Sequence, residues 1–335
     1  MASITFRELD GSSSRYWILL GIIALFAALG LGAAYYMEHH GHIVTGMNNS
    51  VVWGTPHVFA VFLIVAASGA LNVASIASVF GKLTYKPLAP LSGLLAIALL
   101  AGGLTVLMLD LGRPDRLIVA MTYYNFKSVF AWNVVLYTGF FSIVAVYLWT
   151  MMERRMNPYS KAAGVAAFVW RLILTTGTGS IFGFLVARDA YNTALLAPMF
   201  IVLSFAYGLA IYLLIVLASY TWSGRDLGQA LLNRLGRLLG VFVAGGLYFV
   251  FVFHLTNLYF TKQHAVEKFI LLTGGVYPAL FWIGQIARGG IIPMVILFNP
   301  KLRASRGLLV TACLAIVLGG LSQMYVTIIG GQAFP

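Results

Sequence analysis

The chain has 335 residues, of which 61% are hydrophobic and only 9% are charged, and it contains 35 glycines and one cysteine. This composition is far from that of a soluble globular domain. The net charge of +12 would suit a nucleic-acid ligand, but the basic residues lie mostly in short loops between long apolar stretches. We therefore expect a protein surrounded by membrane lipid, with no nucleic-acid partner.

Nine apolar stretches follow one another along the sequence. Each is longer than the roughly 20 residues that a helix needs to cross a bilayer, and a backbone in lipid must satisfy its own polar groups. We predict an all-α polytopic membrane protein with a short tail at residues 1–15 and one integral membrane domain at residues 16–335. The expected helices lie at about residues 16–37, 54–80, 88–112, 126–152, 161–189, 197–222, 236–260, 273–298 and 306–330.

The loops that follow even-numbered helices hold eleven of the 21 Lys and Arg residues, and Arg7 and Arg15 of the tail lie on the same side. The opposite side holds six. The positive-inside rule then places the N-terminus in the cytoplasm and the C-terminus in the periplasm. We expect a multi-pass protein of the bacterial inner membrane.

This topology collects polar and aromatic residues near the outer surface. The second helix begins just before His57, the third ends at Asp110, and Arg113 and Tyr124 lie in the loop before the fourth helix, which carries Trp132 near its start. Ionisable residues at the membrane edge are uncommon and are often functional. The alternative is an interfacial belt, in which aromatic side chains anchor at lipid headgroups and an Asp–Arg pair only ties down the loop.

A quinone headgroup requires a hydrogen-bond donor, a titratable group and flat apolar walls. We expect His57 to hydrogen-bond one quinone oxygen and Asp110 to accept the released proton. Arg113 would hold Asp110 in its charged form, because a nearby opposite charge favours ionisation. Tyr124 and Trp132 would lie against the ring. A purely structural pair of Asp110 with Arg113 remains the alternative.

Two segments carry a resemblance to a known family. Residues 109–114 (Leu-Asp-Leu-Gly-Arg-Pro) close the third helix and precede Asn-Phe-Lys-Ser at 125–128. Together with residues 52–59 (Val-Trp-Gly-Thr-Pro-His-Val-Phe), they resemble the membrane subunits of the polysulfide reductase / NrfD family. Within that family the sequence is most similar to the quinone-interacting subunit of Dsr-type sulfur-metabolism complexes.

The resemblance implies a function. A quinone-binding four-helix bundle would exchange electrons between the menaquinone or ubiquinone pool and a periplasmic, ferredoxin-like iron–sulfur subunit. Cytochrome and catalytic subunits would be further partners in a larger complex, and sulfur-compound metabolism would be its context. The protein would be a non-autonomous, quinone-reactive subunit of an oxidoreductase complex, with no redox cofactor of its own.

Haem, cluster and metal sites are not expected in this protein. One cysteine, Cys313, cannot hold an iron–sulfur cluster alone, because such clusters take about four thiolates. His57 and His254 are the only histidines within the apolar stretches, which is too few for a two-haem core. His39, His40 and His42 lie close together in the first outer loop, but zinc sites usually show wider spacings.

A secondary transporter is the other function that the sequence supports. Arg171 and Arg288 lie deep within the fifth and eighth helices, at similar levels near the bilayer middle. Such arginines must face the protein interior, carbonyl groups or water. In a transporter they would bind a small anion at the midplane, where broken helices often form the binding site. No carboxylate is expected at that depth, so we do not predict proton pumping.

Overall fold

The computed structural model describes residues 14–111 and 113–334. Within these residues it contains nine helices long and apolar enough to span a membrane, which confirms the all-α polytopic fold. Nearly all of the expected tail at residues 1–15 lies outside the described residues, and so does Gly112 of the loop that carries the family resemblance.

Among the first five spans, α1 and α6 each form a span alone, and the other three each join two helical segments. α2 and α3 together make the second span, η2 leads into α4, and η4 leads into α7. The short helices η3 and α5 lie in the loop between the third and fourth spans. The bounds are α1 (Ser14–His40), η1 (His42–Thr45), α2 (Thr55–Ala70), α3 (Asn72–Ser78), η2 (Leu83–Leu88), α4 (Ala89–Leu109), η3 (Pro114–Arg116), α5 (Leu117–Thr122), α6 (Val129–Met152), η4 (Asn157–Tyr159) and α7 (Ser160–Gly183).

The last four spans begin at α8. The eighth span is a succession of α11, η6 and α12, and the ninth runs from α14 through η7 to α15. The bounds are α8 (Leu196–Trp222), α9 (Gln229–Tyr259), α10 (His264–Lys268), η5 (Phe269–Thr273), α11 (Val276–Ala279), η6 (Leu280–Ile291), α12 (Ile292–Phe298), α13 (Pro300–Arg303), α14 (Arg306–Tyr325), η7 (Val326–Gly330) and α15 (Gly331–Ala333).

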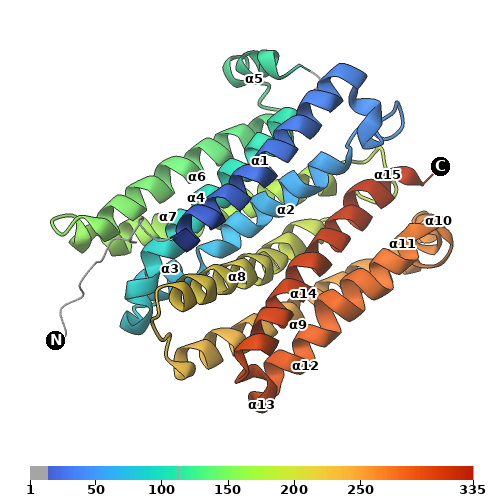
Figure 1. Ribbon diagram of the computed structural model, residues 1–335. Helices are drawn as coiled ribbons and strands as arrows, with labels where there is room; N and C mark the ends of the chain where they lie inside the picture. Colours follow the sequence, from blue (N-terminus) through green and yellow to red (C-terminus); the bar gives the residue numbers. More distant parts are fainter. Residues whose placement is uncertain (1–13, 112, 335) are drawn as a thin grey trace.

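The helices pack as two adjoining bundles (Figure 1). In the first, α2 contacts α4 and α7, while α6 packs against α4 and α7. In the second, α8 contacts α9 and α14, and α14 packs along η6 and α12. α2 joins the bundles by contacting both α8 and α14. α1 stands apart: none of its most apolar stretch is buried, as expected for a helix that is hydrophobic on all sides and faces lipid.

Two glycines allow the bundles to meet. A Cβ added to Gly69 of α2 would overlap the backbone carbonyl of Ser204 in α8, and one added to Gly208 would overlap the backbone of Gly69. The backbones of α2 and α8 are therefore in direct contact. Small residues at such crossings allow membrane helices to pack closely when no hydrophobic effect drives them together.

Helix ends differ most from the sequence-based expectation at the end of α7 and the start of α9. α7 ends at Gly183 rather than near residue 189, because the backbone turns there and a Cβ on Gly183 would lie 2.8 Å from the carbonyl oxygen of Thr193. α9 begins at Gln229, earlier than the predicted 236, because Leu232 and Leu235 are fully buried and extend the packed face. Arg188 consequently lies in a loop and not at a helix end.

The eighth span is wider than an ordinary α-helix. Its central segment η6 is a π-helix of 12 residues, flanked by α11 and α12. The segment that contains Gly289 and Gly290 is therefore continuous but more widely wound than an α-helix, and it is not a broken helix of the transporter kind. A Cβ on Gly289 would lie 2.7 Å from the Cα of Gly319, so this segment lies against the backbone of α14.

Candidate functional site

His57 and Asp110 meet where α2 begins and α4 ends. His57 lies in the first turn of α2, which starts after Gly54 with Pro56 in its first turn, and Asp110 caps the C-terminus of α4. Since these antiparallel helices pack side by side, the start of one adjoins the end of the other. Nδ1 of His57 lies 3.5 Å from Oδ2 of Asp110. The structure thus brings together the two residues that the topology placed at the same level.

The pair is almost fully enclosed. The His57 side chain is 11% exposed and the Asp110 side chain 5%. Oδ1 of Asp110 is buried and has no hydrogen-bond partner among the described residues. Buried polar atoms nearly always have a partner, so an unsatisfied carboxylate oxygen indicates a place where a ligand or a water donates a hydrogen bond.

Trp53 fixes the plane of the imidazole. Its ring stacks on His57 with centroids 5.3 Å apart and an interplanar angle of 8°. Trp53 is in turn packed edge-on against Phe182 at 5.2 Å and near Phe130 of α6 at 6.5 Å. Trp53 belongs to the segment at residues 52–59 that resembles the family, but it was not among the predicted site residues. Its position four residues before His57, just ahead of the same helix, is the signal that would have identified it.

Hydrogen bonds from Gln332, near the C-terminus, hold the backbone of Trp53. Gln332 of α15 accepts hydrogen bonds from the backbone N–H groups of Val52 and Trp53 at 2.9 and 3.1 Å, and donates to the Trp53 carbonyl at 3.3 Å. Arg188 donates to the carbonyl oxygen of Gln332 and to that of Ser50. The C-terminal residues therefore hold the segment that leads into His57.

Tyr191 closes the same region from the loop after α7. Its hydroxyl donates to the backbone carbonyls of Thr327 and Ile328 in η7, which lie 3.0 and 2.9 Å away. Burial raises the pKa of Tyr191, so the phenol keeps the proton that these bonds require. Its ring also lies 6.3 Å from Trp53. Both bundles therefore contribute to the surroundings of the His57–Asp110 pair.

Arg113 does not pair with Asp110. Its side chain is exposed, and the side chain that faces the Asp110 carboxylate within the described residues is His57. The expected ion pair between Arg113 and Asp110 is thus not formed among the described residues. The physical reason is the direction of the backbone: Asp110 ends α4 with its carboxylate toward α2, whereas Arg113 begins the extended turn into η3.

Tyr124 and Trp132 lie at the surface of the protein beside Phe126. Phe126 lies 6.0 Å from the ring of Tyr124 and 5.9 Å from that of Trp132, whose Nε1 donates to the Phe126 carbonyl at 2.9 Å. Both side chains are exposed. Among the described residues, neither forms a hydrogen bond or a ring contact with His57 or Asp110. Phe130 of α6 lies nearer to the pair, because its ring is 6.5 Å from the Trp53 ring that stacks on His57.

Comparison with known proteins identifies the family. The family described as "Polysulphide reductase, NrfD" matches residues 43–335 of the sequence. The protein belongs to the NrfD family. The match begins after α1, so the exposed first helix lies outside it.

The relatives of this NrfD protein carry the names of oxidoreductase components. It is 30% identical over 336 residues to the Hdr-like menaquinol oxidoreductase integral membrane subunit of Archaeoglobus fulgidus, covering 99% of its own length and 84% of that relative. It is 26% identical to a polysulfide reductase component of Wolinella succinogenes, covering 85% and 96%. It is 23% identical to a selenate reductase component of Mesobacillus selenatarsenatis, covering 96% and 82%.

The NrfD protein has a second buried histidine–carboxylate pair in the other bundle. Nδ1 of His254 in α9 lies 2.7 Å from Oε2 of Glu267 in α10, and Asn257 donates to Oε1 of Glu267 at 2.8 Å. The Glu267 side chain is 1% exposed. Both carboxylate oxygens are satisfied, unlike those of Asp110. Glu267 lies between the helices expected at residues 236–260 and 273–298, so this pair was not predicted. The apolar neighbours of Glu267, Val266 and Ile270, are the signal in the sequence that α10 is buried.

The two deep arginines have separate protein partners. Nη1 of Arg171 donates to the Ser68 carbonyl at 3.0 Å and to Oδ1 of Asn72 at 2.8 Å, where α2 gives way to α3. Nη2 of Arg288 donates to the Leu318 carbonyl at 3.2 Å and to Oγ of Ser322 at 3.0 Å. Both face protein groups, as expected. Arg171 thus belongs to the first bundle and Arg288 to the second.

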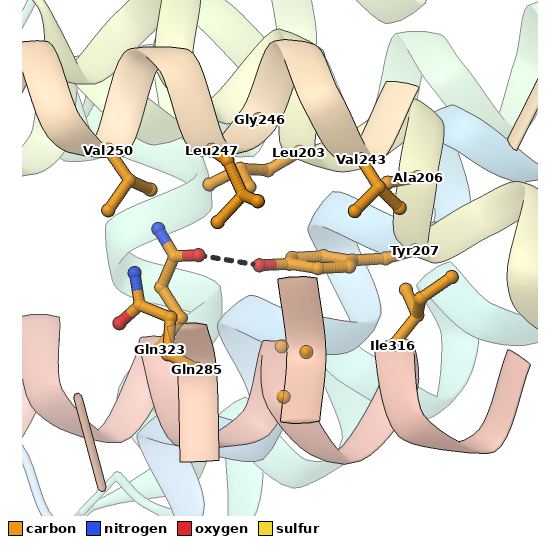
Figure 2. Close-up of a pocket in the computed structure, with 13 residues that line it drawn as sticks. Leu203, Ala206, Tyr207, Val243, Gly246, Leu247, Val250, Gln285, Ile316 and Gln323 are labelled. Carbon is orange, nitrogen blue, oxygen red and sulfur yellow. Dashed lines mark hydrogen bonds between the residues drawn. The ribbon is translucent and has the colours of Figure 1, made fainter. Parts of the chain in front are cut away.

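A small cavity lies inside the second bundle between α8, α9, η6 and α14 (Figure 2). Its volume is about 30 Å³, which is room for about one water molecule. Apolar side chains form most of its wall. The polar groups at one end are Gln285 and Gln323, and Oε1 of Gln323 accepts a hydrogen bond from the Tyr207 hydroxyl at 2.9 Å. The cavity is too small for an organic ligand.

Proposed function

We propose that this NrfD protein is the membrane subunit of a quinone-linked oxidoreductase complex. It would exchange electrons between the menaquinone or ubiquinone pool and an iron–sulfur partner subunit on the outer face. Membership of the family supports this role, as do the names of relatives, which include a menaquinol oxidoreductase integral membrane subunit and a polysulfide reductase component. Sulfur-compound metabolism and a position in the bacterial inner membrane are the finer parts of the proposal.

The observation that carries the proposal is the unsatisfied oxygen of Asp110. A quinol supplies electrons and protons when it is oxidised, so its site needs a buried proton acceptor near the membrane surface. Oδ1 of Asp110 is such an acceptor, because it is buried and lacks a partner within the described residues. Oδ2 lies 3.5 Å from Nδ1 of His57, so in this proposal the pair closes to hydrogen-bond length, or takes up one water, when the proton passes from the carboxylate to the imidazole.

His57 and Trp53 complete the site in this proposal. With Nδ1 of His57 directed at Asp110, Nε2 remains for a quinone oxygen or for passing a proton outward. The stacked Trp53 ring prevents the imidazole from rotating and excludes water from one side of it. Tyr124 and Trp132, exposed on the outer surface, would contact the approaching ring or its tail rather than the buried pair. Arg113, which is exposed directly before η3, has no part in the buried site in this proposal.

Replacement of Asp110 tests the proposal. Asp110→Asn retains the size of the side chain but removes its ability to accept a proton, so quinone-linked turnover of the assembled complex should fall by roughly 100-fold or more. Turnover is measured with a soluble quinol analogue in purified membranes, and assembly by co-purification of the partner subunits. Asp115→Asn, an exposed carboxylate in the same loop, is the matched control and should leave turnover unchanged.

Two results would count against this assignment. If the Asp110→Asn complex assembles and keeps full turnover, Asp110 is not the proton acceptor. If the complex fails to assemble while the Asp115→Asn complex does, Asp110 acts as a structural residue at the end of α4.

A further inference from the structure

A groove opens at the end of the first bundle that lies away from the His57–Asp110 pair. Its volume is about 690 Å³. It is lined by the end of α3, the start of α4 and the end of α6, together with η2 and η4. His57 is at the start of α2, whereas Ser78 of the groove ends α3, so a full membrane span separates them. In Figure 1, α3 and the outer helix α5 lie at opposite ends of the bundle.

The groove carries positive charge without compensating carboxylates. Lys86 of η2 and Arg154, just after α6, both line it, and no Asp or Glu is among its lining residues. Nζ of Lys86 donates to Oδ1 of Asn157 at 3.0 Å, which leaves further hydrogens of the ammonium group for a ligand. The Arg154 guanidinium forms no hydrogen bond or ion pair within the described part of the protein. Two cations that line one groove repel each other, and a bound anion would remove that repulsion.

Most of the remaining wall is apolar, apart from Ser78, Asn157 and Ser160. Leu83 and Met152 are 74% and 66% exposed, and Pro87 and Met151 line the groove beside them. The third membrane span begins at Leu83 and the fourth ends at Met152, so these side chains lie at the membrane edge. A ligand that matches both the two cations and the apolar side chains has an anionic head and long apolar tails.

We propose that this groove binds an anionic phospholipid. Its phosphate would lie between Lys86 and Arg154, and its acyl tails would run along Met151 and Met152. Basic pockets between membrane helices are known to hold such headgroups. Free phosphate would gain nothing from the apolar wall, and a neutral lipid would leave the two cations uncompensated. The bound lipid would join η2 to η4, the loops before α4 and α7, and so stabilise the first bundle. This site is independent of the proposed electron transfer.

The test compares two double variants that remove the same charge. Lys86→Gln with Arg154→Gln alters the groove, whereas Lys82→Gln with Arg155→Gln alters neighbouring residues that do not line it. The full-length protein is purified in detergent, and its thermal unfolding midpoint is measured with dioleoylphosphatidylglycerol, dioleoylphosphatidylcholine or inorganic phosphate. We expect phosphatidylglycerol to raise the midpoint by several degrees for the native protein and the control, but not for the groove variant. Phosphatidylcholine and phosphate should have no effect.

Three outcomes overturn the proposal. Equal responses of the two double variants would show an unspecific charge effect, an equal response to phosphatidylcholine would show that the headgroup charge is irrelevant, and a shift with inorganic phosphate alone would identify a free-anion site. If the groove variant cannot be purified, the single variant Arg154→Gln is compared with Arg155→Gln by mass spectrometry of co-purified lipid. At least a twofold loss of phosphatidylglycerol per protein molecule is expected only for Arg154→Gln, and an unchanged amount contradicts the site.

Discussion

Trp53 connects the His57–Asp110 pair to the remainder of the molecule. Its ring stacks on His57, and its backbone is bound by Gln332 near the C-terminus. The orientation of the imidazole therefore depends on a residue about 280 positions away in the sequence. Such positioning matters in proton transfer, because donor and acceptor must stay within hydrogen-bond reach.

Replacing Trp53 should impair turnover without preventing assembly. Trp53→Leu removes the flat surface that holds the His57 ring, so we expect quinone-linked turnover to fall roughly 10-fold to 100-fold. Trp53→Phe, which keeps an aromatic face, should recover most of it. The pH profile of turnover should shift in Trp53→Leu because the His57–Asp110 geometry loosens. Trp149→Leu, an exposed tryptophan in the last turn of α6, is the control. A profile identical to that of the native complex would exclude a positioning role.

The His254–Glu267 pair is expected to stabilise the second bundle. Breaking a buried ion pair by removing one partner typically costs roughly 3–5 kcal/mol. Glu267→Ala should therefore lower the thermal unfolding midpoint clearly, since both carboxylate oxygens have partners. Lys262→Ala removes an exposed partner of Asp189 and should have little effect. Equal midpoints for the two variants would contradict this structural role.

The residues of the site were easier to predict from the sequence than their contacts. His57 and Asp110 were placed at the same level by helix order alone, and they are adjacent in the structure. Arg113 was wrongly assigned as the ion partner of Asp110, because sequence proximity does not reveal which way a side chain leaves a helix end. The bonds from Gln332 to Trp53 cannot be predicted from spacing, since they join residues near the two ends of the sequence.

At the scale of helices, the crossing of α2 and α8 is the most sensitive contact. Gly69→Val should destabilise the protein by at least roughly 1–3 kcal/mol, because the added side chain would overlap the α8 backbone. Gly102→Val is the control, since a Cβ there meets only Leu63 at an ordinary 3.8 Å. The measurement is thermal unfolding in detergent. Similar losses for both variants would show that the effect comes from valine in a helix rather than from the crossing.

Helix number and type followed from the apolar stretches, whereas helix ends and local winding did not. All nine expected spans are present in the described residues. The early end of α7 depends on the contact of Gly183 with Thr193, and the π-helix η6 on close packing against α14. Both are tertiary effects, which hydropathy does not record. The interruption at Leu71 between α2 and α3 belongs to the same class, because Arg171 and Asn72 bind there.

At the scale of the whole molecule, the distribution of basic residues predicts the orientation. Eleven Lys and Arg follow even-numbered helices, so a reporter fused after Pro335 should be periplasmic. Alkaline phosphatase, which is active only in the periplasm, should be active there, and green fluorescent protein should be dark when exported through the same fusion. The opposite pattern would place the His57–Asp110 pair at the cytoplasmic surface.

The central claim is that the quinone headgroup lies beside His57 and Asp110, and photoaffinity labelling of the assembled complex tests it most directly. An azido-quinone is cross-linked by light, and the labelled peptides are identified by mass spectrometry with and without excess native quinone. We expect competable labelling in the peptides that contain Trp53 to His57 and Leu107 to Leu111. Competable labelling confined to the second bundle around His254, or to the groove at Lys86 and Arg154, would contradict the account.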